Sequence, residues 1–180
     1  MRAWLLLLAS CALTSRSRPL ELRYFAPPTH PIAIGSNAAP VALRLGRITP
    51  SSLLRAKIVH RDSEVELVPY ETMRWSEEPE TYVRRALVRA LFDTRAFEQA
   101  VGGDAATLDV DVLSFEEARH DNHRFGRVVL QYQLRDDRRV VAHGTVEIER
   151  PAGAGIEGAV AAIGDALDAA TAELAKRIAS

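Results

Sequence analysis

Three stretches in the second half of the chain alternate apolar with polar residues, and this pattern constrains the fold more than any other feature. They span Leu108–Val112, Val128–Leu134 and Val140–Ile148. A period of two places successive side chains on opposite faces of a strand. The pattern therefore predicts an antiparallel sheet with one buried and one solvated face. Residues 120–124 form the predicted loop between the first two strands, and Asp136-Asp137-Arg138 the tight turn between the last two.

Two segments carry apolar residues at the three- and four-residue spacing of amphipathic helices. In the first, Ser76 is the expected N-cap, Pro79 lies in the first turn, and the apolar stripe runs over Val83–Phe97. In the second, the stripe runs over Val160–Ile178. Both helices need an apolar surface to cover, and the sheet offers one. We therefore predict an α+β fold, an antiparallel sheet with two amphipathic helices packed on one face, in which no parallel crossover is required.

The first half of the chain predicts further strands. Short strands are expected at Leu20–Phe25 and Val41–Arg47, with an irregular loop rich in Pro and Gly between them. Segments Leu54–His60 and Val65–Tyr70 predict a hairpin around Arg61-Asp62-Ser63. The predicted order is strands, helix, three strands, helix.

The N-terminus has the order of a secretion signal, a positive charge followed by an apolar run. Leu8-Ala9-Ser10-Cys11 matches a bacterial lipobox, in which the cysteine receives a diacylglycerol on its sulfur and becomes the first mature residue. Cys11 is the only cysteine of the chain. The apolar run is too short to span a bilayer, which takes about 20 residues. An ordinary signal peptide with an incidental cysteine is the alternative.

These features give a predicted domain organisation. Residues 1–10 are expected to be a lipoprotein signal peptide, residues 11–23 the lipidated Cys11 and a tether, and residues 24–180 a single domain. The chain has 23 basic and 24 acidic residues, a balance that argues against a nucleic-acid partner, which calls for a basic face. With Cys11 acylated, no thiol is left for a disulfide.

Residues able to carry chemistry are few. His120 and His123 flank Asp121 in a polar turn, and a lone pair of this kind is a weak metal signal, because zinc sites use three or four ligands. Asp109 and Asp111 share one face of a predicted strand and could form a carboxylate pair. Their positions are equally expected for charged residues that alternate along the solvated face of the strand. No nucleophile elbow or phosphate-binding loop is present in the sequence. We predict no catalytic residue, metal site or cofactor.

Tyr70 and Trp75 flank a short connection that precedes the first helix. In one interpretation Trp75 docks into the edge of the core and fixes the entry of the helix. In the other, both residues belong to a partner-binding surface, where aromatic residues are enriched.

The spacing Tyr70-x4-Trp75-x3-Pro79 before an amphipathic helix resembles the family of ABC-type transport auxiliary lipoproteins. The lipobox, the aromatic strand Leu22–Phe25, the strand from Val41 and the strand ending Leu113–Glu116 agree with that family in order. The resemblance covers essentially the whole mature chain. It departs in the loop of residues 26–40 and in an Ala-rich C-terminal tail.

The resemblance implies a non-enzymatic accessory role beside MCE (mammalian cell entry) proteins, the periplasmic substrate-binding components of ABC systems that carry phospholipids or other hydrophobic molecules. The implied partners are the MCE protein and its ABC permease and ATPase, and a homo-oligomer is implied by analogy. Ala12 after Cys11 directs the anchor to the outer membrane by the usual sorting rule, with the domain facing the periplasm. Three alternatives stay open: a lipoprotein of lipopolysaccharide or β-barrel assembly, a secreted hydrolase or metal-binding enzyme using His120, His123 and Asp121, and a domain that itself carries a lipid.

Overall fold

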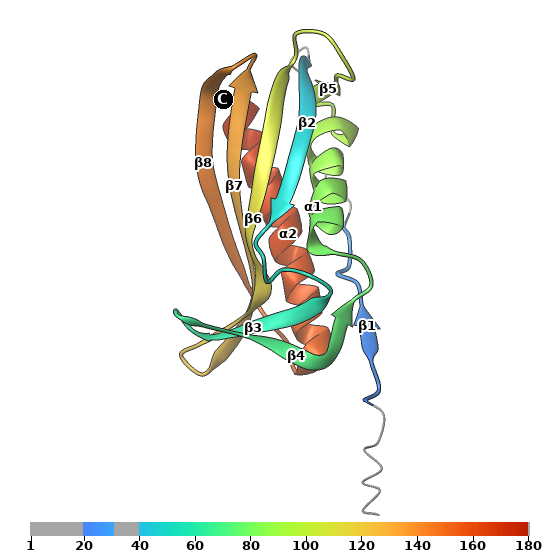
Figure 1. Cartoon of the computed structure of the whole chain (residues 1–180), viewed down its shortest axis with the longest axis vertical. Coiled ribbons are helices and arrows are strands. Elements are labelled where there is room, and N and C mark those ends of the chain that lie inside the picture. Colours follow the sequence, from blue (N-terminus) through green and yellow to red (C-terminus); the bar gives the residue numbers. More distant parts are fainter. Residues whose placement is uncertain (1–19, 31–39, 180) are drawn as a thin grey trace, which may run out of the picture.

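The computed structural model describes residues 20–30 and 40–179. The predictions on residues 1–10 and Cys11, and most of the predicted loop of residues 26–40, lie outside the described residues. A single twisted sheet forms one layer and two helices form the other (Figure 1). The predicted α+β class, with two helices on one face, is confirmed. In chain order the elements are β1 (Arg23–Phe25), β2 (Val41–Pro50), β3 (Lys57–Ser63), β4 (Glu66–Trp75), α1 (Pro79–Val88), η1 (Arg89–Asp93), β5 (Phe97–Gln99), β6 (Ala106–His120), β7 (His123–Asp136), β8 (Arg139–Pro151) and α2 (Gly155–Ala179).

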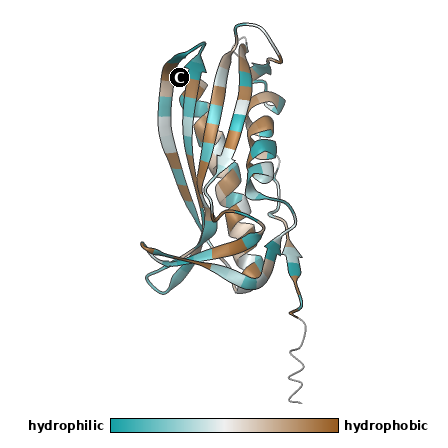
Figure 2. Cartoon of the chain, viewed as in Figure 1, coloured by the Kyte–Doolittle hydropathy of each residue, from teal (hydrophilic) through white to brown (hydrophobic). Residues whose placement is uncertain are grey.

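Strand β6 is the central strand of the sheet and pairs with β2, β3 and β7. The antiparallel meander β6–β7–β8 confirms the three alternating strands, and Figure 2 shows hydrophobic and hydrophilic residues interspersed along them. On its other side β6 pairs with β2 over its first half and with β3 over its second half, and both pairs are parallel. The expectation that no parallel crossover is required was therefore wrong. The alternation of apolar and polar residues indicates which face of a strand is buried, but not the direction of the strand relative to its neighbours. The chain between β2 and β6 contains helix α1, and parallel strands are usually connected through a helix.

A bulge at Leu113 separates the two halves of β6. The register with β7 shifts between Val112 and Ser114. The backbone N–H of Ser51 donates to the carbonyl oxygen of Val112 at 2.9 Å, where β2 leaves the sheet. A bulge bends a strand and disrupts its ladder locally, so this position is where β3 can replace β2 beside β6.

The first helix differs from its prediction at both ends. Its N-cap is Glu78, which makes no side-chain capping bond, and Pro79 is the first helical residue. Ser76 instead shares a hydrogen bond with the Tyr82 hydroxyl at 2.8 Å. After Val88 the backbone widens into the π-helical turn η1, which ends at Asp93. Phe97, the predicted end of the helical stripe, lies in strand β5 instead. Its side chain is still buried, because β5 pairs with β2 and Phe97 faces the core.

The two helices cover the apolar face of the sheet. The largest apolar side chains between the layers are fully buried, and burial of each stabilises the fold by about 1.5–3 kcal/mol. They include Leu87, Leu91, Leu108, Phe115, Leu130, Ile163 and Leu174. At Gly126 strand β7 approaches α2 so closely that a Cβ atom would lie 2.2 Å from the backbone of Ala162 and Ile163. Only glycine permits this contact.

The β3–β4 hairpin is confirmed, although its turn lies at Glu64-Val65 rather than at residues 61–63. Strand β1 pairs in parallel with β4, which confirms the short early strand. The described chain begins at the end of the molecule that carries this hairpin, and the C-terminus lies at the opposite end (Figure 1). Within the described residues no helix has the length and hydropathy needed to cross a membrane.

Candidate functional site

Two adjacent carboxylates, Glu116 and Glu117, lie in the second half of β6, and both side chains are 0% exposed. Neighbouring residues on a strand point to opposite faces of the sheet. One carboxylate therefore points toward the helix layer and the other toward the outer face. A buried carboxylate requires cationic or hydrogen-bonding partners, and arginines supply them on both faces.

Glu117 is the more heavily bonded of the two. Arg124 donates to both of its oxygens at 2.7 and 3.0 Å, Arg119 donates to Oε1 at 2.6 Å, and the Tyr70 hydroxyl donates to Oε2 at 2.7 Å. Burial alone would raise the pKa of Glu117, but the hydrogen bonds from Arg124, Arg119 and Tyr70 outweigh it and lower the pKa from 4.5 to about 2. Burial, then the bond to Glu117, raises the pKa of Tyr70. Glu117 is therefore a fixed anion at physiological pH.

The Glu117 cluster joins four elements of the fold. Tyr70 comes from β4, Arg119 from β6 itself and Arg124 from β7. Arg124 also donates to the carbonyl oxygen of Gly155 at 2.9 Å, at the start of α2. The cluster thus ties the β3–β4 hairpin, the sheet and the N-terminal end of α2 to a single buried charge.

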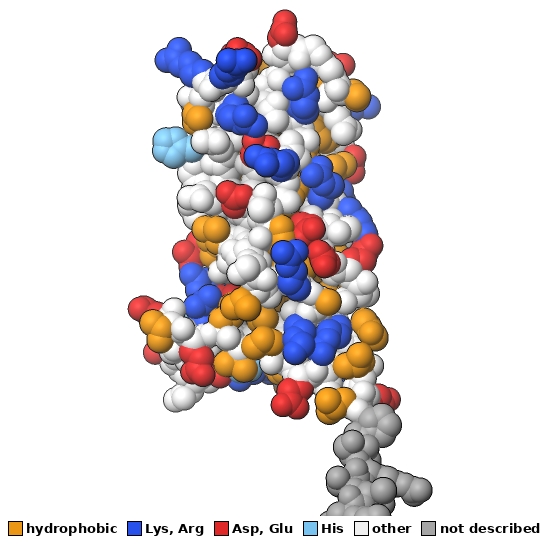
Figure 3. Space-filling view, viewed as in Figure 1, with side chains coloured by type: hydrophobic (Ala, Val, Ile, Leu, Met, Phe, Trp, Pro, Cys, Tyr) orange, Lys and Arg blue, Asp and Glu red, His pale blue; other side chains and the backbone are white. Residues whose placement is uncertain are grey.

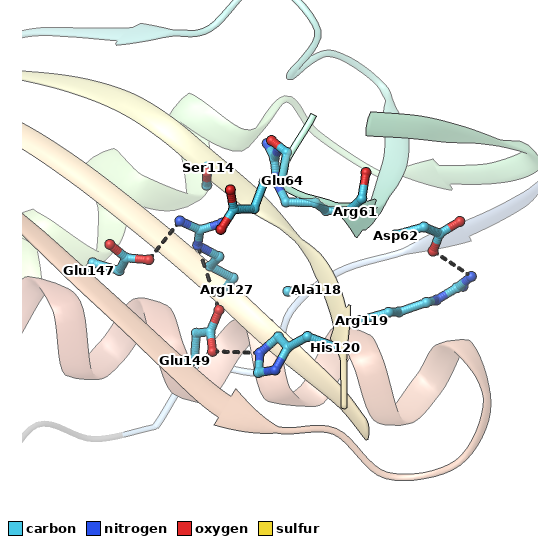
Figure 4. Close-up of a pocket in the computed structure, with 11 residues that line it drawn as sticks. Arg61, Asp62, Glu64, Ser114, Ala118, Arg119, His120, Arg127, Glu147 and Glu149 are labelled. Atoms are coloured by element: carbon cyan, nitrogen blue, oxygen red, sulfur yellow. Dashed lines mark hydrogen bonds and ion pairs between the residues drawn. The ribbon is translucent and has the colours of Figure 1, made fainter. Parts of the chain in front are cut away.

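A pocket of about 620 Å³ lies on the outer face, between the β3–β4 hairpin and strands β6–β8 (Figure 4). The buried Glu116 does not line this pocket, but it pairs with Arg61, which does. Arg61 donates its Nε–H to Glu116 at 2.6 Å. Arg127 lies in the pocket between Glu147, at 2.6 Å, and Glu149, at 3.7 Å. The pocket is thus lined by side chains of both signs, which is the chemistry of a docking surface for a polar partner.

His120 closes the lower side of the pocket. Its Nε2 lies 3.1 Å from Glu149 (Figure 4), and this hydrogen bond raises the pKa of the imidazole. Its ring stacks on Phe125 with the centroids 4.4 Å apart. His123 instead bonds through Nδ1 to the backbone oxygen of Asp121 at 2.6 Å, across a two-residue turn with positive φ at Asp121 and Asn122. No group of three or more His, Cys, Asp or Glu is placed to hold a metal ion in the described ranges.

The remaining residues singled out in the sequence lie apart from this pocket. Trp75 is 2% exposed and packs edge-on against Phe115 and Tyr82, with centroids 5.1 and 6.0 Å away. Its burial favours the core interpretation and removes it from any surface that a partner could contact. Asp109 pairs with Arg135, farther along the outer face, and Asp111 is exposed. Tyr70 is half-buried and commits its hydroxyl to Glu117, so contact with a partner stays a prediction for this residue.

Sequence reasoning missed Glu116 and Glu117. The sequence feature that could have revealed them is the occurrence of two successive acids at the end of the predicted strand. Because neighbouring residues of a strand point to opposite faces, one of the two must point toward the core. Of their arginine partners, Arg61 comes from β3, whose pairing with β6 the sequence does not predict, and Arg124 from the segment predicted to be a loop. Only the three-dimensional pairing brings these residues together.

Comparisons with known proteins show what the chain as a whole is similar to. Residues 25–179 match the sequence model of a protein family described as ABC-type transport auxiliary lipoprotein component. Among solved structures, a protein from Xanthomonas campestris is similar with a TM-score of 0.74 and 24% identity, over 84% of this chain and 92% of that chain. An uncharacterized protein gives a TM-score of 0.71 at 18% identity, over 88% of this chain and 99% of that one.

A hypothetical protein from Chlamydia trachomatis shares the fold at a TM-score of 0.55 and 7% identity, over 78% of this chain and 96% of that chain. At these identities the likeness establishes the fold alone. None of the curated proteins compared with the chain matches it.

Proposed function

The chain belongs to the family of ABC-type transport auxiliary lipoproteins, and on that premise we propose that it is an accessory of an MCE-type ABC transporter. In this role it is anchored through acylated Cys11 to the inner leaflet of the outer membrane and faces the periplasm. It acts by protein contact and not by catalysis. The observation that carries the proposal is the family match over residues 25–179. This match begins 14 positions after Cys11, the cysteine of the lipobox.

The outer-face pocket is the proposed contact with the transporter. Its charged groups are held in place by ion pairs: Arg61 by the buried Glu116, Arg127 by Glu147, and His120 by Glu149. A preformed arrangement of this kind offers a partner both donors and acceptors without reorganisation, which supports specific docking. Anchoring adds to the affinity, because a tethered domain meets its membrane-bound partner at high effective concentration.

Affinity purification of the full chain from solubilised envelope, at native expression, tests this role. An MCE protein with its permease and ATPase is expected to copurify. Mass spectrometry of the same sample reports whether Cys11 carries its diacylglycerol. Recovery of acylated protein without any transport component would count against the proposal. Recovery of lipopolysaccharide or β-barrel assembly factors would support the alternative role in outer-membrane assembly.

A matched pair of substitutions tests the pocket. Glu64 lies at the tip of the hairpin and lines the pocket, and its carboxylate forms no ion pair with a described residue. Glu98 is a comparable exposed acid on β5, near the other end of the sheet. Glu64→Lys is expected to reduce copurification of the transporter, and Glu98→Lys to leave it unchanged. Equal recovery with both variants would remove the pocket from the proposed contact.

A further inference from the structure

Three apolar side chains stand exposed where the described chain begins. Leu20 is 66% exposed, Leu22 44% and Tyr24 64%. Tyr24 lies in β1, and Leu22 and Leu20 precede it at the two-residue spacing that places side chains on one face of an extended chain. Arg23, between Leu22 and Tyr24, faces the other way and pairs with Glu157 of α2 at 2.7 Å.

Basic side chains follow Tyr24 across the sheet. The register places Tyr24 beside Arg74 of β4, and Arg74 beside Lys57 of β3. Lys57 is exposed and forms no ion pair within the part of the chain that the structure describes. Arg74 donates to backbone oxygens, among them that of Glu71 at 2.8 Å, and it likewise has no carboxylate partner among described residues. Figure 3 shows basic and hydrophobic side chains side by side at this end.

Leu20, Leu22, Tyr24, Lys57 and Arg74 together are called the β1 patch. Leu20 lies nine positions after Cys11 in the sequence. A chain of that length spans at most about 30 Å when fully extended. If Cys11 holds acyl chains in a bilayer, the β1 patch is therefore always close to the lipid surface.

We infer that the β1 patch rests on the anionic headgroups of the membrane that holds the Cys11 acyl chains. The inference rests on the proposed lipid anchor. Leucine and tyrosine are side chains that lie favourably at the boundary between headgroups and acyl chains. Lysine and arginine beside them are attracted to anionic phospholipids. A second copy of the chain or another protein would need carboxylates opposite Lys57, whereas a bilayer containing anionic lipid supplies negative charge at every position.

The contact fixes the orientation of the whole domain. Strand β1 is hydrogen-bonded to β4, and Arg23 holds it to α2. Tyr24, Lys57 and Arg74 of the β1 patch are therefore part of the sheet and not of the tether. When the β1 patch rests on the membrane, the end with the hairpin and the outer-face pocket is proximal to the lipid, and the β7–β8 turn with the C-terminus points away (Figure 1).

A fluorescent reporter tests the contact in the full lipidated chain. Since Cys11 is the only cysteine, its acylation leaves an engineered cysteine as the single reactive thiol. Leu22→Cys places an environment-sensitive NBD group in the β1 patch. Val141→Cys places the same group at an exposed position of β8 near the other end, 52% exposed in the native protein. Both proteins are reconstituted in vesicles of phosphatidylethanolamine and phosphatidylglycerol, with and without lipids that carry a quencher.

Blue-shifted emission and quenching by the lipid are expected at position 22 but not at position 141. Lys57→Glu should reduce the ratio of docked to undocked domain by about 25-fold, because each unit of charge near an anionic surface contributes about fivefold and this substitution changes the charge by two units. The matched variant Lys176→Glu, an exposed lysine near the C-terminal end of α2, should not. In vesicles of phosphatidylcholine alone the difference between the two lysine variants should disappear.

Two results would overturn the inference. One is emission at position 22 as water-exposed as at position 141, in protein whose Cys11 is shown by mass to be acylated. The other is a blue shift at position 22 without lipid quenching, which would mean that protein covers the patch. Absence of the acyl chains from the purified chain would instead refute the proposed anchor itself, so the two failures are distinguishable.

Discussion

Glu117→Gln isolates the contribution of one buried charge. Glutamine keeps the shape of the side chain and imitates the protonated acid, so it removes the charge that Arg119 and Arg124 share. The pKa of Glu117 falls from 4.5 to about 2 in the folded chain. Since one pKa unit corresponds to about 1.4 kcal/mol, the charge stabilises the folded state by about 3 kcal/mol at neutral pH. This is an upper figure, because both arginines are partly solvated and can recover some hydration.

The pH dependence gives the prediction its sign. A carboxyl whose pKa is lowered by folding stabilises the protein above its unfolded pKa, and this stability is lost as the pH falls toward the folded pKa. The loss should therefore occur between about pH 4.5 and pH 2. The difference in unfolding free energy between wild type and Glu117→Gln should shrink from about 3 kcal/mol at pH 7 to about 1.4 kcal/mol at pH 3.

Urea unfolding of the purified lipoprotein in mild detergent, followed by circular dichroism at both pH values, measures this difference. Glu173→Gln is the control, because Glu173 forms an exposed i,i+4 pair with Arg177 and should change stability by less than about 0.5 kcal/mol. A Glu117→Gln difference that is equal at both pH values would refute the reasoning, since the loss would then come from packing and not from charge.

Three further substitutions probe other parts of the structure. Tyr70→Phe removes the hydroxyl that donates to Glu117 and should lower the unfolding free energy by about 1–1.5 kcal/mol in urea; an unchanged value would mean that the arginines alone satisfy the carboxylate. Trp75→Ala empties a buried site between Phe115 and Tyr82 and should cost about 3–5 kcal/mol, measured by thermal unfolding; a loss below about 1 kcal/mol would contradict its core position. Gly126→Ala forces a Cβ against the backbone of α2 and should cost about 1–3 kcal/mol, whereas an unchanged melting temperature would show that α2 can move away.

The meander β6–β7–β8 and the C-terminal helix could be predicted from the sequence because their signals are local. Alternation, turn residues and helical spacing each lie within one segment. The partners of β2 and β3 could not be predicted, because both lie beside β6 by parallel pairing across more than 40 residues of chain. Phe97 was misplaced because a buried residue satisfies the helical stripe and the strand β5 equally well.

The site residues were hidden for a different physical reason. Charged residues are usually solvated, so Arg61, Arg124 and Arg127 read as surface positions in the sequence. Their role depends on two acids that the sheet buries, and that burial follows from the unpredicted neighbour β3. The sequence did contain one anomaly, the pair Glu116-Glu117, which interrupts the alternation of β6.

The buried carboxylates also explain how the outer-face pocket keeps its shape. Among the described residues, the β3–β4 hairpin pairs with β6 at two register positions, His60 with Glu117 and Arg61 with Ala118, and its other neighbour is the short strand β1. So short a ladder leaves the angle of the hairpin weakly specified. Two side-chain bonds add the missing constraints, one to each face of β6: Arg61 to Glu116 at 2.6 Å and Tyr70 to Glu117 at 2.7 Å. Because directional buried bonds are costly to leave unmade, they hold the hairpin over strands β6–β8. Loss of either carboxylate should therefore weaken docking in the pocket even though neither is exposed to a partner.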